Sequence, residues 1–175
     1  KAIIKKDFKK ACELLNIQIS NNDFIGELRK QPRRLLRFYI SSYQAYLWNR
    51  LLELSLSKTK GNTKIKSGNQ ELIIAKVDLP NFDIPLISFD TELTEEIKAL
   101  LEKENVELRD FVISQMPELI TQTSFRKAFI EPKNIESRFL QDELNKNKLK
   151  LEIKFFLTKG SYATILIKKL ETYLN

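Results

Sequence analysis

One short junction near the C-terminal end constrains the fold of this chain more than any other feature. Residues 149–156 alternate apolar and charged side chains, a pattern typical of a strand with one buried face. Gly160 follows, and then an apolar helical stripe that runs from Ile165 to Leu170. The sequence therefore predicts a strand, a tight glycine turn and a helix, with Ser161 as the N-cap residue of that helix.

The side chains around this turn suggest a ligand. The turn carries a cation, Lys159, and an aromatic ring, Tyr162. The hydroxyl groups of Ser161 and Thr164 lie beside them in sequence, and none of these four residues is acidic. A strand–turn–helix junction directs backbone N–H groups at whatever lies above the strand end, which suits a phosphate with a stacked base. An ordinary capped helix with a surface tyrosine has the same pattern, so the residues alone leave both interpretations open.

The same residues carry a family resemblance. Residues 156–170 resemble the C-terminal signature of the TruD family of tRNA pseudouridine synthases, a strand ending in Leu-Pro-x-Gly-Ser-Tyr/Phe-Ala-Thr before an apolar helix with Arg-Glu. Thr158 stands at the family's proline, and Lys168-Lys169 stand at its Arg-Glu. Three other segments are similar to family motifs and occur in family order: 33–50, 79–83 and 125–132. Together the four matches span nearly the whole chain.

Two motifs of the family do not occur in this sequence. One is the Lys-Asp-Arg type motif with the catalytic aspartate, and the other is the Asn-Tyr-Phe-Gly segment that follows it. The resemblance therefore implies the C-terminal portion of such an enzyme, as a fragment, a split subunit or the ordered part of a longer protein. We expect no catalytic residue in this chain, and the missing N-terminal part of the catalytic domain as a partner.

The resemblance implies an α+β fold in two parts. Residues 1–120 would form the helix-rich insertion domain of the family, and residues 121–175 would return to the catalytic sheet as antiparallel strands and a helix. Periodicity places strands at 125–131 and 149–157 and a helix at 162–174, with 135–140 irregular. The resemblance implies that both strands belong to the catalytic sheet and that the helix packs on it.

Helical periodicity dominates the earlier part of the chain. Helices are expected at 5–15, 24–30, 32–56 and from Thr91 to about residue 103, with a strand at 71–77 and a loop or hairpin at 57–69. In the longest helix, aromatic and aliphatic residues recur at helical spacing. An amphipathic helix buries such a stripe, so Tyr39, Tyr43 and Leu47 are predicted in the core.

By resemblance, the chain would serve the isomerisation of a uridine to pseudouridine, at position thirteen of tRNA, in the cytoplasm. The family needs no metal and no organic cofactor. Its active-site aromatic falls on Tyr162, and Lys159 and Ser161 would contact the substrate beside it. Arg126 is a further candidate for substrate binding, at the start of a strand. The implied partner is tRNA.

The charge distribution adds candidates for phosphate contact. The formal net charge is +7, from 30 Lys and Arg against 23 Asp and Glu. Arg33, Arg34 and Arg37 share one side of the longest helix, where they could meet RNA phosphates or form an ordinary solvated face. A lysine-rich bias can also reflect an AT-rich or heat-adapted source. Two other functions therefore stay open: an RNA-binding module without catalysis of its own, and a protein-interaction domain whose charge is incidental.

Composition excludes several classes of site. The chain has no histidine, which removes Ser–His and Cys–His catalysis and histidine-containing zinc sites. Cys12 is the single cysteine, so no internal disulfide can form, and its place on an apolar helical stripe predicts a buried thiol. No apolar run approaches the length of a membrane span, so no membrane partner is expected.

Overall fold

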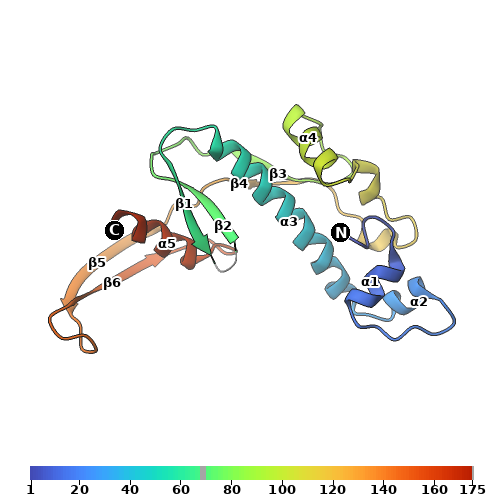
Figure 1. Ribbon diagram of the computed structural model, residues 1–175, viewed down its shortest axis with the longest axis horizontal. Helices are drawn as coiled ribbons and strands as arrows, with labels where there is room; N and C mark the ends of the chain where they lie inside the picture. The colour runs from blue at the N-terminus through green and yellow to red at the C-terminus, as the bar shows by residue number, and fades with distance from the viewer. Residues whose placement is uncertain (68–69, 175) are drawn as a thin grey trace. The chain divides into compact units, whose positions relative to one another are not determined.

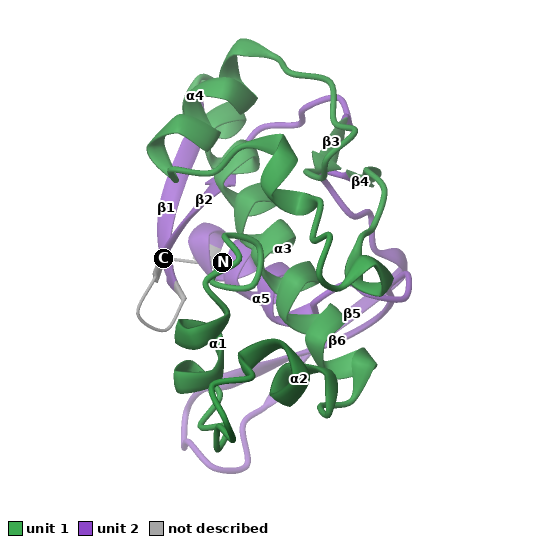
Figure 2. Cartoon of the chain, turned by 90° about the vertical axis from the view of Figure 1, so that its right-hand side faces the viewer, with its two compact units in different colours: residues 1–60, 83–126 green, residues 61–82, 127–175 purple. Residues whose placement is uncertain are grey.

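The computed structural model describes residues 1–67 and 70–174. Figure 1 labels the helices and strands along the chain. The chain divides into two compact units, each built from separate stretches of sequence (Figure 2). Unit 1 comprises Lys1–Lys60 and Asp83–Arg126, and unit 2 comprises Gly61–Phe82 and Lys127–Asn175. The chain therefore passes three times from one unit to the other.

Unit 1 is mainly helical. Its elements are α1 (Phe8–Leu14), α2 (Phe24–Arg29), α3 (Arg33–Ser57), β3 (Asp83–Leu86), α4 (Glu95–Lys103), two 3-10 turns at Leu108–Phe111 and Pro117–Leu119, and β4 (Ser124–Lys127), whose last residue belongs to unit 2. Strands β3 and β4 are hydrogen-bonded neighbours. The helices predicted for this part of the chain are all present. α1 and α4 begin later than predicted, whereas α3 ends one residue beyond its predicted end.

Side-chain caps fix where these helices begin. The Asp7 carboxylate accepts from the backbone N–H of Lys10 at 3.1 Å, and Asp23 accepts from Gly26 at 2.8 Å. The fourth helix starts later than the expected Thr91, because the Thr94 hydroxyl accepts from the Ile97 N–H at 3.3 Å. Satisfying the first free N–H groups is what stabilises a helix start.

The core of unit 1 is organised by α3. Leu47 is fully buried, Tyr43 is 8% exposed and Tyr39 is half-buried, so the first two core predictions are confirmed and the third holds in part. Gln44 is also buried, and its amide donates to the carbonyl of Ile87 at 2.9 Å. Such a bond offsets the cost of burying the amide.

Cys12 lies in this core, as expected. Its thiol is fully buried, and burial raises the pKa of the Cys12 thiol. The thiol therefore acts as a small apolar side chain.

Unit 2 contains two antiparallel hairpins and a helix. Strands β1 (Asn62–Ser67) and β2 (Gln70–Ala75) form the first, with Ile65 opposite Leu72. Strands β5 (Lys133–Gln141) and β6 (Leu149–Phe156) form the second, with Phe139 opposite Leu151. Helix α5 runs over Ala163–Leu174. Of the loop or hairpin predicted at 57–69, Ser57 ends α3 and residues 62–67 form a strand of the first hairpin, while residues 68–69 lie outside the described part of the chain.

Two expectations for the C-terminal strands are wrong. Residues 135–140, expected to be irregular, lie within β5. Charged and polar residues obscure the strand pattern in this part of the sequence. Pairing with β6 stabilises the strand, and an ion pair between Arg138 and Glu152 at 2.7 Å joins the two strands. The strand expected at 125–131 ends at Lys127 and pairs with β3, so it does not share a sheet with β6. The α+β class itself is confirmed.

None of the helices in the described part of the chain is both long and apolar enough to cross a bilayer.

Candidate functional site

The candidate turn joins β6 to α5 and has the geometry that its glycine predicts. The N–H of Ser161 donates to the carbonyl of Thr158 at 3.2 Å, which closes a four-residue turn. Gly160 has φ +88°, a conformation that side-chain-bearing residues rarely adopt. A Cβ on Gly160 would meet nothing within 4 Å. The backbone conformation, and not lack of space, therefore requires glycine here.

The side chains of the turn lie at the surface. Tyr162 is 76% exposed and Lys159 is also exposed, while Ser161 is half-buried. The helix begins at Ala163, so Ser161 is not its N-cap; the Ser161 hydroxyl instead lies 2.9 Å from the Thr158 hydroxyl. An aromatic ring this exposed contributes little to a core, which leaves it available to stack on a ligand.

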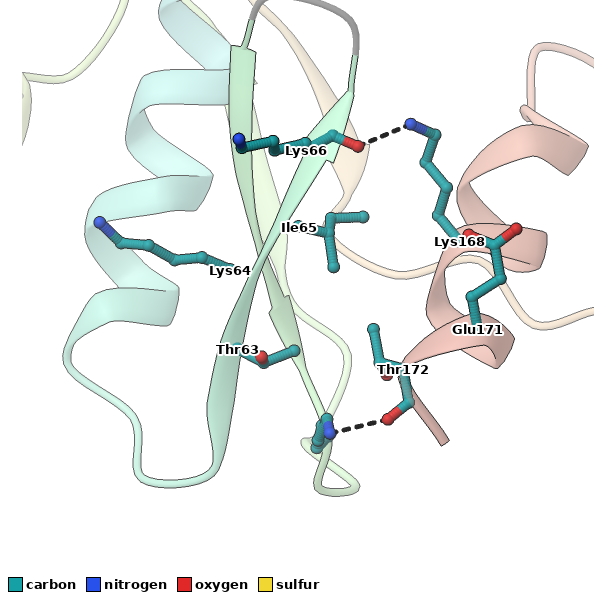
Figure 3. A pocket seen from close by; sticks show the side chains of 8 residues that line it. Thr63, Lys64, Ile65, Lys66, Lys168, Glu171 and Thr172 are labelled. Carbon is teal, nitrogen blue, oxygen red and sulfur yellow. Dashed lines mark hydrogen bonds between the residues drawn. The ribbon is translucent and has the colours of Figure 1, made fainter. Parts of the chain in front are cut away.

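Long-range hydrogen bonds hold α5 against the β1–β2 hairpin (Figure 3). The Lys168 ammonium donates to the carbonyl of Lys66 at 2.8 Å, and the Lys76 ammonium donates to the carbonyl of Thr172 at 2.8 Å. The Tyr173 hydroxyl donates to the carbonyl of Lys76 at 2.9 Å. Lys76 thus places a cation at the C-terminal end of the helix, where the helix dipole favours it.

An open groove of about 390 Å³ separates this helix from the hairpin. In Figure 3, Thr63 and Ile65 point towards α5 whereas Lys64 points to the other side of the hairpin, as alternation along a strand requires. The remaining lining residues are Lys66, Lys76, Lys168, Glu171 and Thr172. Lys168, at the family's arginine position, thus has a structural contact that anchors the helix behind the turn.

Two of the segments that resemble family motifs are in contact within unit 2. The Asn81 side chain accepts from the N–H of Phe129 at 3.1 Å and donates to its carbonyl at 2.9 Å. The rings of Phe82 and Phe129 pack edge to face, with centroids 5.8 Å apart. This pairing was not predicted, because neither segment carries a local sequence signal for the other.

The predicted arginines fall into two groups. Arg126 is exposed on β4 and belongs to unit 1, whereas the turn belongs to unit 2. Arg33 and Arg37 both donate to the carbonyl of Glu118, at 3.0 Å and at 2.9–3.1 Å, and Arg34 is exposed beside them. The structure thus brings Arg33 and Arg37 together through a loop carbonyl that the sequence analysis did not single out.

The carboxylates are used structurally. Asp90 accepts from both the N–H and the hydroxyl of Thr123, at 2.8 and 2.6 Å, and these hydrogen bonds lower the pKa of the Asp90 carboxyl. Glu104 accepts from Tyr46 at 2.9 Å and from Tyr43 at 3.3 Å. Within residues 1–67 and 70–174, no group of three metal-ligating side chains is placed to hold a metal ion.

Comparison with known proteins decides the family. The family model described as "tRNA pseudouridine synthase D (TruD)" matches residues 75–170, which include the turn and both contacting segments. A protein of Methanococcus maripaludis named "Probable tRNA pseudouridine synthase D 1" is 31% identical over 97% of this chain. The chain belongs to the TruD family.

Other TruD relatives give the same picture. A Methanocaldococcus jannaschii protein named "Probable tRNA pseudouridine synthase D 2" is 31% identical over 85% of this chain. The crystal structure of a Methanosarcina mazei protein described as "Putative tRNA pseudouridine synthase D (TruD)" has the same fold, with a TM-score of 0.63 over 96% of this chain at 20% identity. The chain spans 46% of the first relative, 39% of the second and 44% of the crystallised protein.

Proposed function

We propose that this chain is the C-terminal portion of a tRNA pseudouridine synthase, which isomerises a uridine of tRNA in the cytoplasm, at position thirteen as in the family. The observation that carries the proposal is the exposed Tyr162 beside the Gly160 turn, inside the segment that matches the TruD family model. The reaction exchanges a bond from C1′ to N1 of the base for one from C1′ to C5, so it needs no oxidant.

In this proposal the turn forms one wall of the uridine site. A base in folded RNA must leave its stack before chemistry, and an aromatic surface offsets part of that cost. Tyr162 would supply that surface, while Lys159 and Ser161 would contact the phosphate or the base edge. Arg126, Arg33, Arg34 and Arg37 would bind further phosphates.

The aspartate that attacks the sugar would come from the N-terminal part of the catalytic domain, which this chain lacks. Apolar surface on unit 2 supports this: in the second hairpin Ile135, Phe139, Leu149 and Phe156 are each about 60% exposed. Two-stranded hairpins are marginal alone, and exposed apolar strands commonly continue into a larger sheet. We propose that the missing N-terminal part of the catalytic domain covers them.

The first test separates an enzyme portion from an RNA-binding module. The purified chain should form no pseudouridine on unmodified tRNA, and the full-length protein should form it. Substituting the upstream aspartate with asparagine should abolish turnover while tRNA binding persists. Binding without turnover in the full-length protein would favour the RNA-binding module, and pseudouridine formed by this chain alone would refute the division of labour.

The second test concerns Tyr162. In the full-length protein, Tyr162→Ala should reduce turnover at least about a hundredfold, as loss of a positioning contact can. Tyr162→Phe should retain most activity because the ring persists. Phe38, 63% exposed in unit 1, provides the matched control, and Phe38→Ala should leave turnover unchanged. A fall in melting temperature with retained turnover would assign Tyr162 a structural role instead.

A further inference from the structure

Three arginines from two helices converge on one loop of unit 1. Arg29, in the last turn of α2, donates to the carbonyl of Gln115 at 2.6 Å. Arg33 and Arg37, from the first two turns of α3, donate to the carbonyl of Glu118. All three residues are exposed. We call Arg29, Arg33 and Arg37 the arginine row.

The charge of the arginine row is not neutralised. Its acceptors are neutral carbonyls. In the described part of the chain, no carboxylate lies within ion-pair distance of the row. The first turn of α3 carries no acidic residue. Three other arginines differ from the row, because Arg50, Arg109 and Arg138 each pair with a glutamate at 2.6–2.7 Å.

This arrangement favours an anion. Two guanidinium groups within 3.1 Å of the same oxygen repel each other, and an anion placed against both would relieve that repulsion. A guanidinium has five N–H donors in a planar fork. Arg29 and Arg33 use one donor each and Arg37 uses two, so all three keep donors for another acceptor. The bond to the carbonyl fixes the orientation of the side chain and reduces the entropy lost on binding.

We infer that the arginine row is a preformed binding site for the phosphate backbone of RNA, in unit 1 and distinct from the turn that carries Tyr162. The inference rests on the proposed function, and adds Arg29 and a way of orienting the arginines. Contacts to phosphates position an RNA without reading its sequence. The row would therefore govern how strongly tRNA is held and not which uridine is modified.

The experiment measures tRNA affinity against salt concentration in the full-length protein, for Arg29→Gln, Arg33→Gln, Arg37→Gln and the triple variant. Each lost phosphate contact should reduce the log–log salt slope by about 0.7 to 0.9, and the triple variant by about two to three. The identity of the modified uridine should not change. Arg109→Gln is the matched control, since Glu107 already neutralises Arg109, and its slope should equal that of the wild type.

Lysine variants separate charge from architecture. Arg33→Lys and Arg37→Lys keep the positive charge but cannot reproduce the fork, so the salt slope should stay near wild type while the melting temperature falls. If the glutamine and lysine variants have equally lowered melting temperatures and an unchanged salt slope of tRNA binding, the row only stabilises the loop and the inference fails. If wild-type protein neither binds tRNA nor forms pseudouridine, the proposed function fails as well.

Discussion

The two units use apolar side chains in opposite ways. In unit 1, long apolar residues such as Leu47, Ile87 and Met116 are fully buried around α3. In unit 2, Ile74 and Ala75 are the only buried apolar residues among those whose side chains the structure describes. Unit 2 instead exposes apolar side chains such as Phe139 and Phe156. Its turn nevertheless has a defined backbone conformation, with Gly160 at φ +88°. A unit with its own core can fold alone, whereas the exposed apolar surface of unit 2 is of the kind that binding partners cover, which is the basis of the proposal that the missing part covers it.

The largest expected effect is on the core of unit 1. Leu47→Ala should lower the free energy of unfolding by about 2–5 kcal/mol, because it leaves a cavity. The matched change in unit 2, Phe139→Ala, should alter it by no more than about 0.5 kcal/mol. Trp48 is the only tryptophan, lies in α3, and reports the unfolding of unit 1 by fluorescence in urea. Because Trp48 lies in unit 1, hydrogen exchange of β5 and β6 reports the Phe139→Ala variant. An equal loss of stability in the two variants would break the comparison.

Hydrogen exchange should show the same contrast within one sample. In the purified chain, amides of α3 should exchange only on global unfolding, and amides of β5 and β6 should exchange much faster, because few buried contacts hold those strands. In the full-length protein the same strands should be protected at least about tenfold more, which corresponds to about 1.4 kcal/mol. Unchanged protection would mean that the missing part does not cover them.

Two glycines should resist substitution for different reasons. Gly160→Ala should cost about 1–2 kcal/mol of local stability in unit 2, since φ +88° is strained for alanine. Gly26→Ala should cost a similar amount in unit 1 because its Cβ would lie 2.0 Å from the Asp23 carboxylate that caps α2.

Asparagine distinguishes the two. It tolerates positive φ, as Asn16, Asn105 and Asn134 do in this chain, so Gly160→Asn should recover most of the loss while Gly26→Asn should not. Hydrogen exchange of the α5 amides measures the effect of the two Gly160 substitutions, and Trp48 fluorescence in urea measures the effect of the two Gly26 substitutions. Recovery at both positions would rule out the steric argument for Gly26.

The smallest expected effect is a pH dependence confined to unit 1. Burial raises the pKa of the Glu104 carboxyl, but hydrogen bonds from Tyr46 and Lys1 outweigh it and leave the pKa below the ordinary value. A lowered folded-state pKa means that the ionised form stabilises the folded state. This contribution is complete above the unfolded-state pKa, and is lost as the pH falls through the folded-state value.

The check is urea unfolding of Glu104→Gln across the acidic range. The variant should lose part of the acid sensitivity of the Trp48 transition. Glu143 in unit 2 also has a lowered pKa, through hydrogen bonding to Lys150, but it is exposed, and surface pairs contribute little. Glu143→Gln should therefore leave the transition unchanged, and an equal effect of both substitutions would contradict the assignment.

Local signals explain what the sequence could predict. Helical periodicity identified α3 with its buried Tyr43 and Leu47, and the glycine before an apolar stripe identified the turn ahead of α5. Both features depend on neighbours in sequence. The family resemblance, confirmed by the comparisons, supplied the rest of the expected architecture.

Features that depend on residues far apart in the sequence could not be predicted from local patterns. β5 was not predicted because its sequence is polar and its stability comes from pairing with β6. The anchoring of the arginine row on the Gln115 and Glu118 carbonyls joins residues more than 80 positions apart. The boundary between an insertion domain at 1–120 and a return at 121–175 stays a prediction, as do the roles of the site residues.

The bond between Lys76 and Thr172 has a consequence for synthesis of the protein. Its two partners are 96 residues apart, with most of unit 2 and a long part of unit 1 between them. At about 5–20 residues per second, a ribosome takes roughly 5–20 s to make that stretch. During this time the β1–β2 hairpin lacks its contacts with α5. Its strand edges carry unpaired backbone groups that other nascent chains could pair with. Lys64 and Lys66, which lie two residues apart on β1, supply the charge that discourages such pairing.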